Sequence, residues 1–208
     1  MAKTDNPYRL ADKAAELLNR RAVRRFDSTK NKLSQLKFDE LNVIKETKSL
    51  YEKLADDNLE VMLDLSKEQY ERVEPHGKKK PTKAWLVAFL AAYNAVTKYV
   101  YMNEVERKRE RLAESINSVN AKLSEFDKGL AYWSRMTGWY LDMVLDESTL
   151  KAFEDAGVKK VMWNTQEDEK VCKTCRERNK KIYPIGNIPP KPHPGCRCWF
   201  SPVVEDKE

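Results

Sequence analysis

Apolar residues recur at every third or fourth position through most of residues 1–156, which is the period of an amphipathic helix. The spacing predicts a first helix from Pro7 to about Phe26, a second from Thr29 to about Leu54 and a third from Leu59 to Val73. Asp56 or Asp57 is expected to cap the third helix, although the break before it can be only a kink. The apolar stripe of the second helix is narrow, so we expect it to pack against neighbouring helices.

The segment Glu74 to Pro81, EPHGKKKP, predicts an exposed loop, because it combines two prolines, a glycine and three lysines. Thr82 is then expected to cap a central helix that reaches about Ser115. Its first half, AWLVAFLAAYNAVTKYVYM, is apolar on nearly every side, so we expect other helices or a partner protein to enclose it. Its second half, NEVERKRERLAES, is charged and is expected to project into solvent.

A nearly seven-residue apolar repeat runs from Lys122 to Leu145 and predicts an aromatic-rich helix that packs on its neighbours. Asp146 is expected to cap a separate short helix that ends at Ala156. Gly157 can then stop this helix in the left-handed conformation.

The first segment with strand character is Val158 to Asn164, VKKVMWN, whose β-branched and aromatic residues lead into the cysteine-containing segment. Ile182–Tyr183 and Cys198–Phe200 are candidates to pair with it. We therefore expect a mainly α fold, in which an elongated domain of long helices over residues 1–156 precedes a small α+β, zinc-knuckle-like module over residues 157–208. Such a small sheet buries too little apolar surface to fold unaided, so metal binding would supply the missing stability.

Charged residues make up 35% of the chain, and the formal net charge is +6. Because 33 acidic residues accompany 39 basic ones, this surface allows nucleic-acid contact without requiring it. Four arginines fall in the last turns of the first predicted helix: Arg20, Arg21, Arg24 and Arg25. We interpret them as a solvated helix end that favours the negative pole of the helix dipole, with phosphate contact as the alternative.

Residues 1–10 lack the apolar core of a secretory signal peptide, and the longest apolar run, Ala84 to Tyr93, is shorter than the ~20 residues that span a bilayer. We therefore expect a soluble protein, made in a reducing cytoplasm, that has no membrane partner.

All four cysteines and one of the two histidines lie between Val171 and Trp199. Cys172 and Cys175 form a C-x2-C pair, and a loop separates them from His193, Cys196 and Cys198 in the sequence H-P-G-C-R-C. Two short ligand pairs joined by a loop are the pattern of a tetrahedral zinc site. Five candidates compete for four positions, and the spacing favours Cys172, Cys175 and Cys196 with one or both of His193 and Cys198. Two disulfides or unliganded thiols are the alternatives.

Asp168 and Glu169 lie close enough before Cys172 to suggest a catalytic zinc with a general base. However, four protein ligands rich in thiolate would leave no open coordination position and would blunt the Lewis acidity of the metal. We therefore expect a structural zinc ion with no enzyme activity, and Asp168 as a turn or cap residue.

Basic residues crowd the cysteine-containing segment: Arg176, Arg178, Lys180, Lys181, Lys191 and Arg197. Because of these residues, the main alternative function is that of a zinc ribbon, one that binds nucleic acid outside any particle.

The segment from Gly157 to Pro202 closely resembles the C-terminal domain of the phage Mu F-like minor head proteins, the phage head-morphogenesis family. The residues that carry the resemblance are Trp163, Thr165, Asp168, Cys172, Cys175, Tyr183, Pro189, Pro190, Pro192 and the run His193-Pro194-Gly195-Cys196-Arg197-Cys198. The chain departs from the pattern at Arg178-Asn179-Lys180, where the family usually shows a glycine-bearing turn. Asn179 tolerates left-handed geometry, so we still expect a turn there. The helical segment that contains NEVERKRERLAE also looks like the helical region of these proteins.

The resemblance implies a minor component of a tailed-phage head, located at or near the portal vertex and involved in head assembly or genome delivery. Its expected partners are the portal protein, the major capsid protein or both, with packaged DNA as a further partner through basic residues. It implies no small-molecule substrate, and it implies a virion protein that is assembled in the host cytoplasm.

Overall fold

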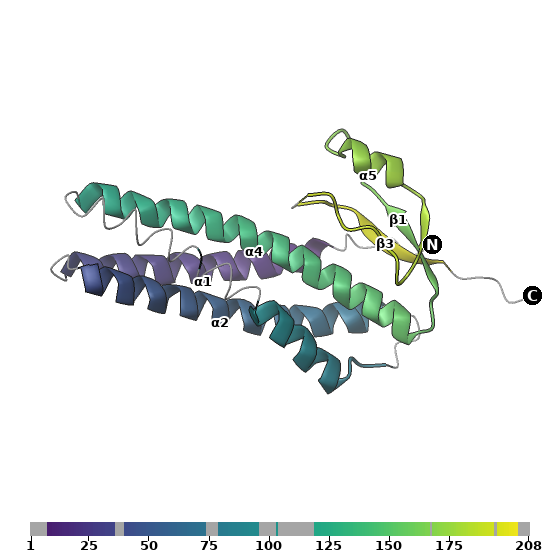
Figure 1. Cartoon of the computed structure of the whole chain (residues 1–208), viewed down its shortest axis with the longest axis horizontal. Helices are drawn as coiled ribbons and strands as arrows, with labels where there is room; N and C mark the ends of the chain where they lie inside the picture. The colour runs from purple at the N-terminus through teal and green to yellow at the C-terminus, as the bar shows by residue number, and fades with distance from the viewer. Residues whose placement is uncertain are drawn as a thin grey trace, which may run out of the picture. The chain divides into compact units, whose positions relative to one another are not determined.

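The computed structural model describes residues 8–35, 40–73, 79–95, 103, 119–166, 168–193 and 195–203. The chain is mainly helical and carries a small antiparallel sheet near its C-terminus, as predicted (Figure 1). The elements are α1 (Tyr8–Gln35), α2 (Glu40–Val73), α4 (Val119–Asp155), β1 (Lys160–Asn164), α5 (Lys173–Arg178), β2 (Ile182–Pro184) and β3 (Trp199–Val203). Residues 83–95 are also helical. No helix within these described ranges is both long enough and apolar enough to cross a membrane.

The first helix is longer than predicted. It continues beyond Phe26 to Gln35, because Thr29 and Leu33 extend the buried face of the same helix instead of belonging to a new one. The expected break between Phe26 and Thr29 is therefore wrong, and the four arginines before it lie in the middle of α1.

The start of the second predicted helix, residues 29–35, belongs to α1. From Glu40 onward, the second and third predicted helices form one continuous helix, α2. Asp57, a proposed cap, is instead buried and paired with Arg25 of α1. In the same way α4 runs through Asp146 without interruption to Asp155, so the separate short helix is also wrong. Gly157 follows with φ of +83°, as the predicted left-handed stop requires.

The described part of the predicted loop, residues 79–81, has no regular structure, and the helix begins directly after Thr82, its predicted cap. The other loop residues, 74–78, lie outside the described residues. So does most of the predicted central helix beyond residue 95, although Asn103 is helical.

Contacts divide the chain into two compact units. The helical unit comprises residues 14–63 and 83–137, and the cysteine unit comprises residues 1–13, 64–82 and 138–208. The contacts thus assign the second half of α4 to the same unit as the cysteines. The domain boundary at residue 157 stays a prediction.

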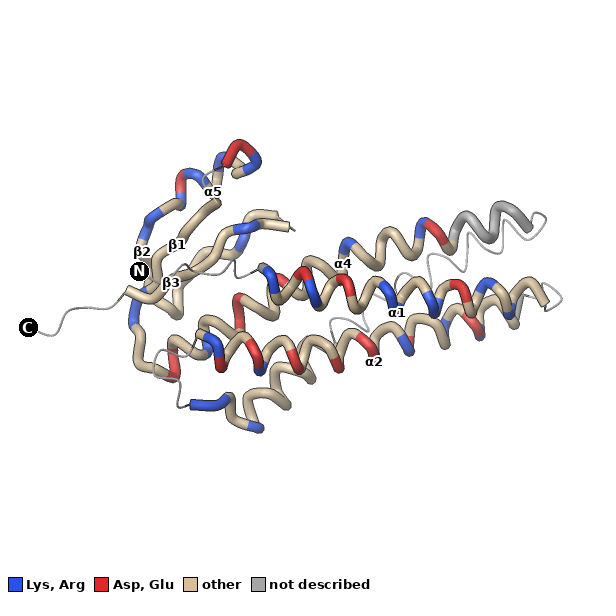
Figure 2. Tube along the Cα trace, turned by 180° about the vertical axis from the view of Figure 1, so that it is seen from behind, with Lys and Arg blue, Asp and Glu red and all other residues tan. Residues whose placement is uncertain are grey.

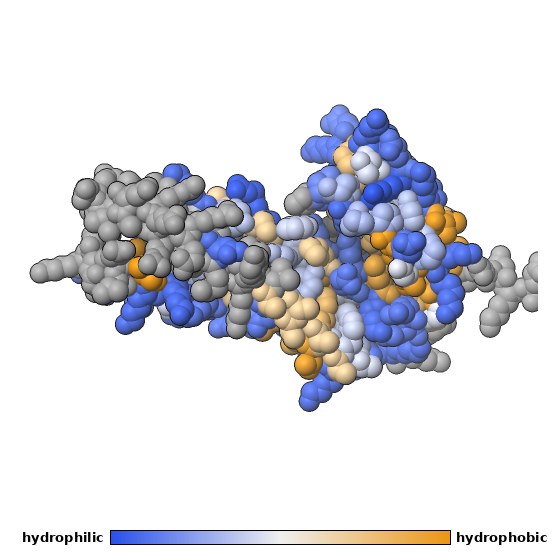
Figure 3. Space-filling model, in the orientation of Figure 1, coloured by the Kyte–Doolittle hydropathy of each residue, from blue (hydrophilic) through white to orange (hydrophobic). Residues whose placement is uncertain are grey.

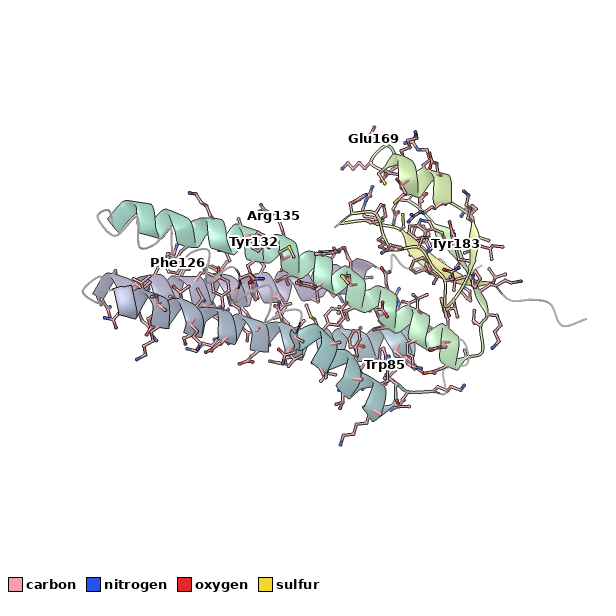
Figure 4. All side chains as sticks on the ribbon, viewed as in Figure 1. Trp85, Phe126, Tyr132, Arg135, Glu169 and Tyr183 are labelled. Carbon is pink, nitrogen blue, oxygen red and sulfur yellow. The ribbon has the colours of Figure 1, made fainter. Side chains whose placement is uncertain are left out.

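The helical unit has an aromatic core between α1, α2 and α4. The Phe26 ring meets Tyr51 edge-on at 6.2 Å between centroids, and it meets Phe126 of α4 at 6.4 Å (Figure 4). Trp133 lies 5.8 Å from Tyr51 and is 1% exposed. Leu54, also 1% exposed, belongs to this core, so the unit is held by ordinary apolar burial.

The helical residues 83–95 were expected to be enclosed by other helices or by a partner protein, and the described helices of this chain do not enclose them. Phe89 is the buried residue of this segment, and it stacks on Trp85 with 5.0 Å between ring centroids. Val87 is 56% exposed. Figure 3 shows an apolar surface over these residues, to which the exposed Ala84, Ala88 and Ala91 also belong.

In the cysteine unit, buried polar side chains join α2 to α4. Among the described residues, Ser148 bonds to Ser66 at 2.9 Å and Gln69 bonds to Thr149 at 2.8 Å, and the partly buried Tyr70 bonds to Asp155 at 2.8 Å. Because an unpaired buried polar group is costly, these pairs favour one register of the two helices over others.

The sheet has the order β2-β1-β3, and both pairs are antiparallel. Val161 of β1 lies opposite Tyr183 of β2, and Trp163 lies opposite Phe200 of β3. The predicted strand and both of its expected partners are confirmed. The short helix α5 was not predicted.

The turn after α5 places its left-handed residue one position later than expected. Asn179 has φ of −55°, whereas Lys180 has φ of +62°. Asn179 instead accepts a hydrogen bond from the Thr165 backbone at 3.1 Å, and the Lys180 backbone donates to the Trp163 carbonyl at 2.7 Å. These bonds to the neighbouring strand hold Lys180 in a conformation that non-glycine residues seldom adopt.

We predict that Leu54→Ala lowers the free energy of unfolding by about 2–5 kcal/mol, because it opens a cavity in the aromatic core. Leu17→Ala, a matched truncation on α1 at a side chain that is 37% exposed, should cost less than about 1 kcal/mol. Urea unfolding followed by circular dichroism measures both. Equal losses would contradict this description of the core.

Candidate metal centre

The first ligand pair is built on the start of α5. Cys172 is the N-cap residue, and its sulfur accepts a hydrogen bond from the Cys175 backbone N–H at 3.4 Å. This bond turns the chain so that the Cys175 side chain, one turn later, lies near the Cys172 sulfur. The helical spacing and the cap together form a two-cysteine turn of the kind that holds one edge of a metal ion.

The second group of ligands comes from the segment after the proline-rich loop, and it meets the first at Cys175. The ligand atoms of Cys172, Cys175 and His193 lie within 4.8 Å of one another, and so do those of Cys175, Cys196 and Cys198. The structure therefore brings all five predicted residues together in two triads that share Cys175.

The four cysteines are free thiols, so the disulfide alternative is not what the structure shows. The sulfur atoms of Cys175 and Cys196 are 3.4 Å apart, compared with about 2 Å in a disulfide bond. Sulfur atoms at this separation are close enough to share one ion. The donor set can hold a metal ion, and its richness in thiolate suits zinc.

Burial distinguishes the five candidates. Cys175, Cys196 and Cys198 are 2–3% exposed, Cys172 is half-buried, and His193 is exposed. The three buried sulfurs therefore form the inner part of the site, and Cys172 and His193 lie at its rim.

Hydrogen bonds between the sulfur atoms separate their acidities. The hydrogen bond from Cys198 is the main cause that lowers the pKa of Cys196 to about 5, and nearby Lys191 contributes to this shift. Burial raises the pKa of Cys175 to about 12, and the bond to Cys196 raises the pKa of Cys198. The Cys175 backbone N–H lowers the pKa of Cys172, and His193 adds to this effect. The pKa of Cys172 and the pKa of Cys196 are thus both shifted toward the thiolate form that a metal ion requires.

Aromatic side chains cover one side of the sulfur cluster. Trp163 is fully buried and meets Phe200 edge-on at 5.3 Å and Tyr183 at 6.3 Å between ring centroids (Figure 4). The guanidinium of Arg178 lies 5.1 Å from the Trp163 ring centre. These contacts exclude water, and they belong to the same apolar cluster as Cys175, Cys196 and Cys198.

Asp168 has the turn role that was expected. It accepts a hydrogen bond from the Lys170 backbone at 3.0 Å, and it forms an ion pair with Arg197 at 2.6 Å. The hydrogen bond from the Arg197 guanidinium is the largest of the effects that lower the pKa of Asp168 below its usual range. Because Arg197 lies between Cys196 and Cys198, this pair joins the second ligand segment to the turn that precedes Cys172. Glu169 is exposed at the outer end of that turn (Figure 4).

A second ion pair anchors the proline-rich loop. Lys191, two residues before His193, contacts Asp146 of α4 at 2.6 Å, and both side chains are mostly buried. Burial raises the Asp146 pKa to about 7, while Lys191 opposes the rise. Sequence reasoning counted Lys191 among the phosphate-contacting candidates and Asp146 among the helix caps. It missed the pair because no local pattern links residues 45 positions apart in the sequence.

Comparison of the chain with protein-family models, with curated proteins and with solved structures finds no match.

Loss of a residue that only hydrogen-bonds to a metal ligand typically weakens metal binding by roughly 10–100-fold. We predict that Cys175→Ser and Cys172→Ser each weaken zinc binding by more than this. His193→Ala should stay within that range, because His193 is exposed and supports Cys172. A zinc-chelator competition assay under reducing conditions measures these affinities. If His193→Ala costs more than Cys172→Ser, then His193, and not Cys172, is the fourth ligand beside Cys175, Cys196 and Cys198.

We predict that Lys191→Met destabilises the protein by about 3–5 kcal/mol at pH 8, because it leaves the Asp146 carboxylate buried without a partner. The double variant with Asp146→Asn should recover most of this loss. In Lys191→Met, the pKa of Asp146 in the folded state rises further above its pKa in the unfolded state, which is about 4. The stability of this variant therefore decreases as the pH rises above about 4. Denaturation at saturating zinc should therefore show a smaller loss at pH 5. An equal loss at both pH values would contradict the role given to the pair.

Proposed function

We propose that one zinc ion, held by Cys172, Cys175, Cys196 and Cys198, is a structural element of the cysteine unit. The observation that carries this proposal is the meeting of two ligand pairs at the Cys175 sulfur, with three of the four sulfurs buried. Zinc supplies the link between two segments that otherwise share a sheet of only three short strands.

A structural ion fits this site better than a catalytic one. Four thiolates would complete the tetrahedral coordination and place most of the compensating charge on the metal, which weakens its action as a Lewis acid. Of the two carboxylates that suggested a general base, Asp168 is paired with Arg197, and Glu169 is exposed at the outer end of its turn. We therefore propose a protein without enzyme activity at this centre.

At the biological level we propose a minor head protein of a tailed bacteriophage, with a role in assembly or genome delivery at or near the portal vertex. The support is the resemblance carried by the segment from Trp163 to Cys198, whose cysteines and histidine are the residues that form the centre. The exposed apolar residues of segment 83–95 are consistent with a protein that docks on a portal or capsid partner.

The alternative, a nucleic-acid-binding zinc ribbon, is less well supported, because most of the basic residues near the centre are already engaged. Arg197 and Lys191 form ion pairs, and Lys180 donates to Asn164 at 3.2 Å. Arg178 donates to the Pro190 carbonyl at 2.7 Å, and Arg176 donates to the Val171 carbonyl at 3.4 Å. Binding phosphate with these side chains would mean giving up internal contacts.

We predict that peptides of this chain are found by mass spectrometry in heads purified from the phage that encodes it, and that the chain co-purifies with the portal ring. Tail fractions from the same preparation are the control. Recovery from intracellular nucleic acid alone, and release by nuclease, would contradict the proposal and favour the zinc-ribbon alternative.

A further inference from the structure

A pocket of about 380 Å³ lies between α1 and α2 in the helical unit, within the range of sizes typical of small-ligand sites. Among the described residues, the acidic ones that line it are Glu46 and Asp57. Its basic lining residues are Arg21, Arg24, Arg25, Lys32 and Lys53. The excess of positive charge is local, since Figure 2 shows basic and acidic residues interleaved along both helices.

The observed length of α1 rules out the interpretation of its arginines as residues of a helix end. They were interpreted as a solvated helix end facing the negative pole of the dipole, but α1 continues to Gln35. Arg21, Arg24 and Arg25 therefore lie mid-helix, where the dipole offers them no favourable terminus. Their gathering at one pocket needs another explanation.

Two of the arginines are held in place from one side of the pocket. Asp57, which is 8% exposed, accepts bonds from both the Nε and the terminal nitrogen of Arg25, the latter at 2.8 Å. Arg21 is bonded to Glu60 at 3.0 Å and lies 3.6 Å from Asp57. The hydrogen bond to Glu60 raises the pKa of Arg21, and the bond to Asp57 raises that of Arg25. These pairs fix the two guanidinium groups before any ligand arrives.

The remaining cations are not neutralised in this way. Arg24 and Lys53 are exposed, and no ion pair is formed by either within the described residues. Lys32 has only a 3.5 Å contact with Glu46. An anion in the pocket would therefore meet positive charge that the protein itself leaves largely uncompensated.

Hydroxyl groups complete the chemistry of the lining. Ser28, Thr29 and Ser49 contribute them from the two helices, beside the basic residues. Guanidinium, ammonium and hydroxyl donors around one pocket form the combination that recognises phosphate oxygens. A phosphate group also carries more charge than a single carboxylate, which matches the excess of cations.

We propose that this pocket is a phosphate-binding site in which Arg24 and Lys53 make the principal ionic contacts. The phosphate belongs either to a nucleic-acid backbone or to a free phosphorylated molecule. The site lies entirely in the helical unit and uses none of the metal ligands, so it does not depend on the zinc proposal.

The test compares two double variants with equal loss of charge. Arg24→Gln/Lys53→Gln alters the pocket, whereas Arg20→Gln/Lys48→Gln removes the same charge from α1 and α2 at residues outside the lining. The probes are a fluorescein-labelled short DNA duplex, followed by anisotropy, and sodium pyrophosphate, followed by calorimetry. Circular dichroism checks that both variants retain the helix content of the original protein.

The pocket variant should lose about tenfold or more in affinity for the probe that binds, because it removes two charge-assisted contacts. For DNA, the slope of log affinity against log salt should also become shallower by about 2. The control variant should change neither quantity appreciably. A chelator should leave this binding unchanged, which separates it from any failure of the metal site.

A response with DNA assigns the phosphate to nucleic acid, and a response with pyrophosphate alone assigns it to a free phosphorylated molecule. Two results would overturn the proposal. In one, neither probe binds the unaltered protein at low salt. In the other, the pocket and control variants lose affinity equally, which would show a general charge effect without a site.

Discussion

The meeting of two ligand-bearing turns at the Cys175 sulfur is the constraint on which the C-terminal part of the protein depends. One turn is held by the cap bond between Cys172 and the Cys175 backbone, and the other carries Cys196 and Cys198. The contacts around them, including the Asp168–Arg197 pair, bring the two segments together. A metal ion would tie them further, because it gains its binding energy only when both turns are in place.

Different interactions stabilise the helical unit and the cysteine unit. The helical unit buries large side chains such as Phe26, Tyr51 and Trp133, and this burial needs no ion. The cysteine unit has the helix register set by buried polar pairs, but its sheet is short and its apolar cluster includes the sulfurs themselves. Loss of metal should therefore affect the sheet and its loops, while the aromatic core of the helical unit stays folded.

Sequence reasoning succeeded where the determinant is local or chemical. The ligand types and spacing predicted the five clustered residues, β-branched residues predicted β1, and Gly157 predicted a left-handed helix end. It failed where tertiary contacts override a local signal. Asp57 and Asp146 look like helix caps, but each pairs with a distant basic residue and the helix continues through it. Lys180, not Asn179, takes the left-handed conformation, because bonds to the neighbouring strand position both residues. The local sequence does not indicate which distant residues form these contacts.

The most direct test of the central claim is elemental analysis of protein purified under reducing conditions without chelator, combined with amide NMR spectra before and after metal removal. The account predicts one zinc ion per chain. On removal of the metal, dispersed signals from β1, β2 and β3 should be lost while those of the aromatic helical core persist. Protein that contains no metal, or a sheet whose signals are unchanged by chelation, would contradict it.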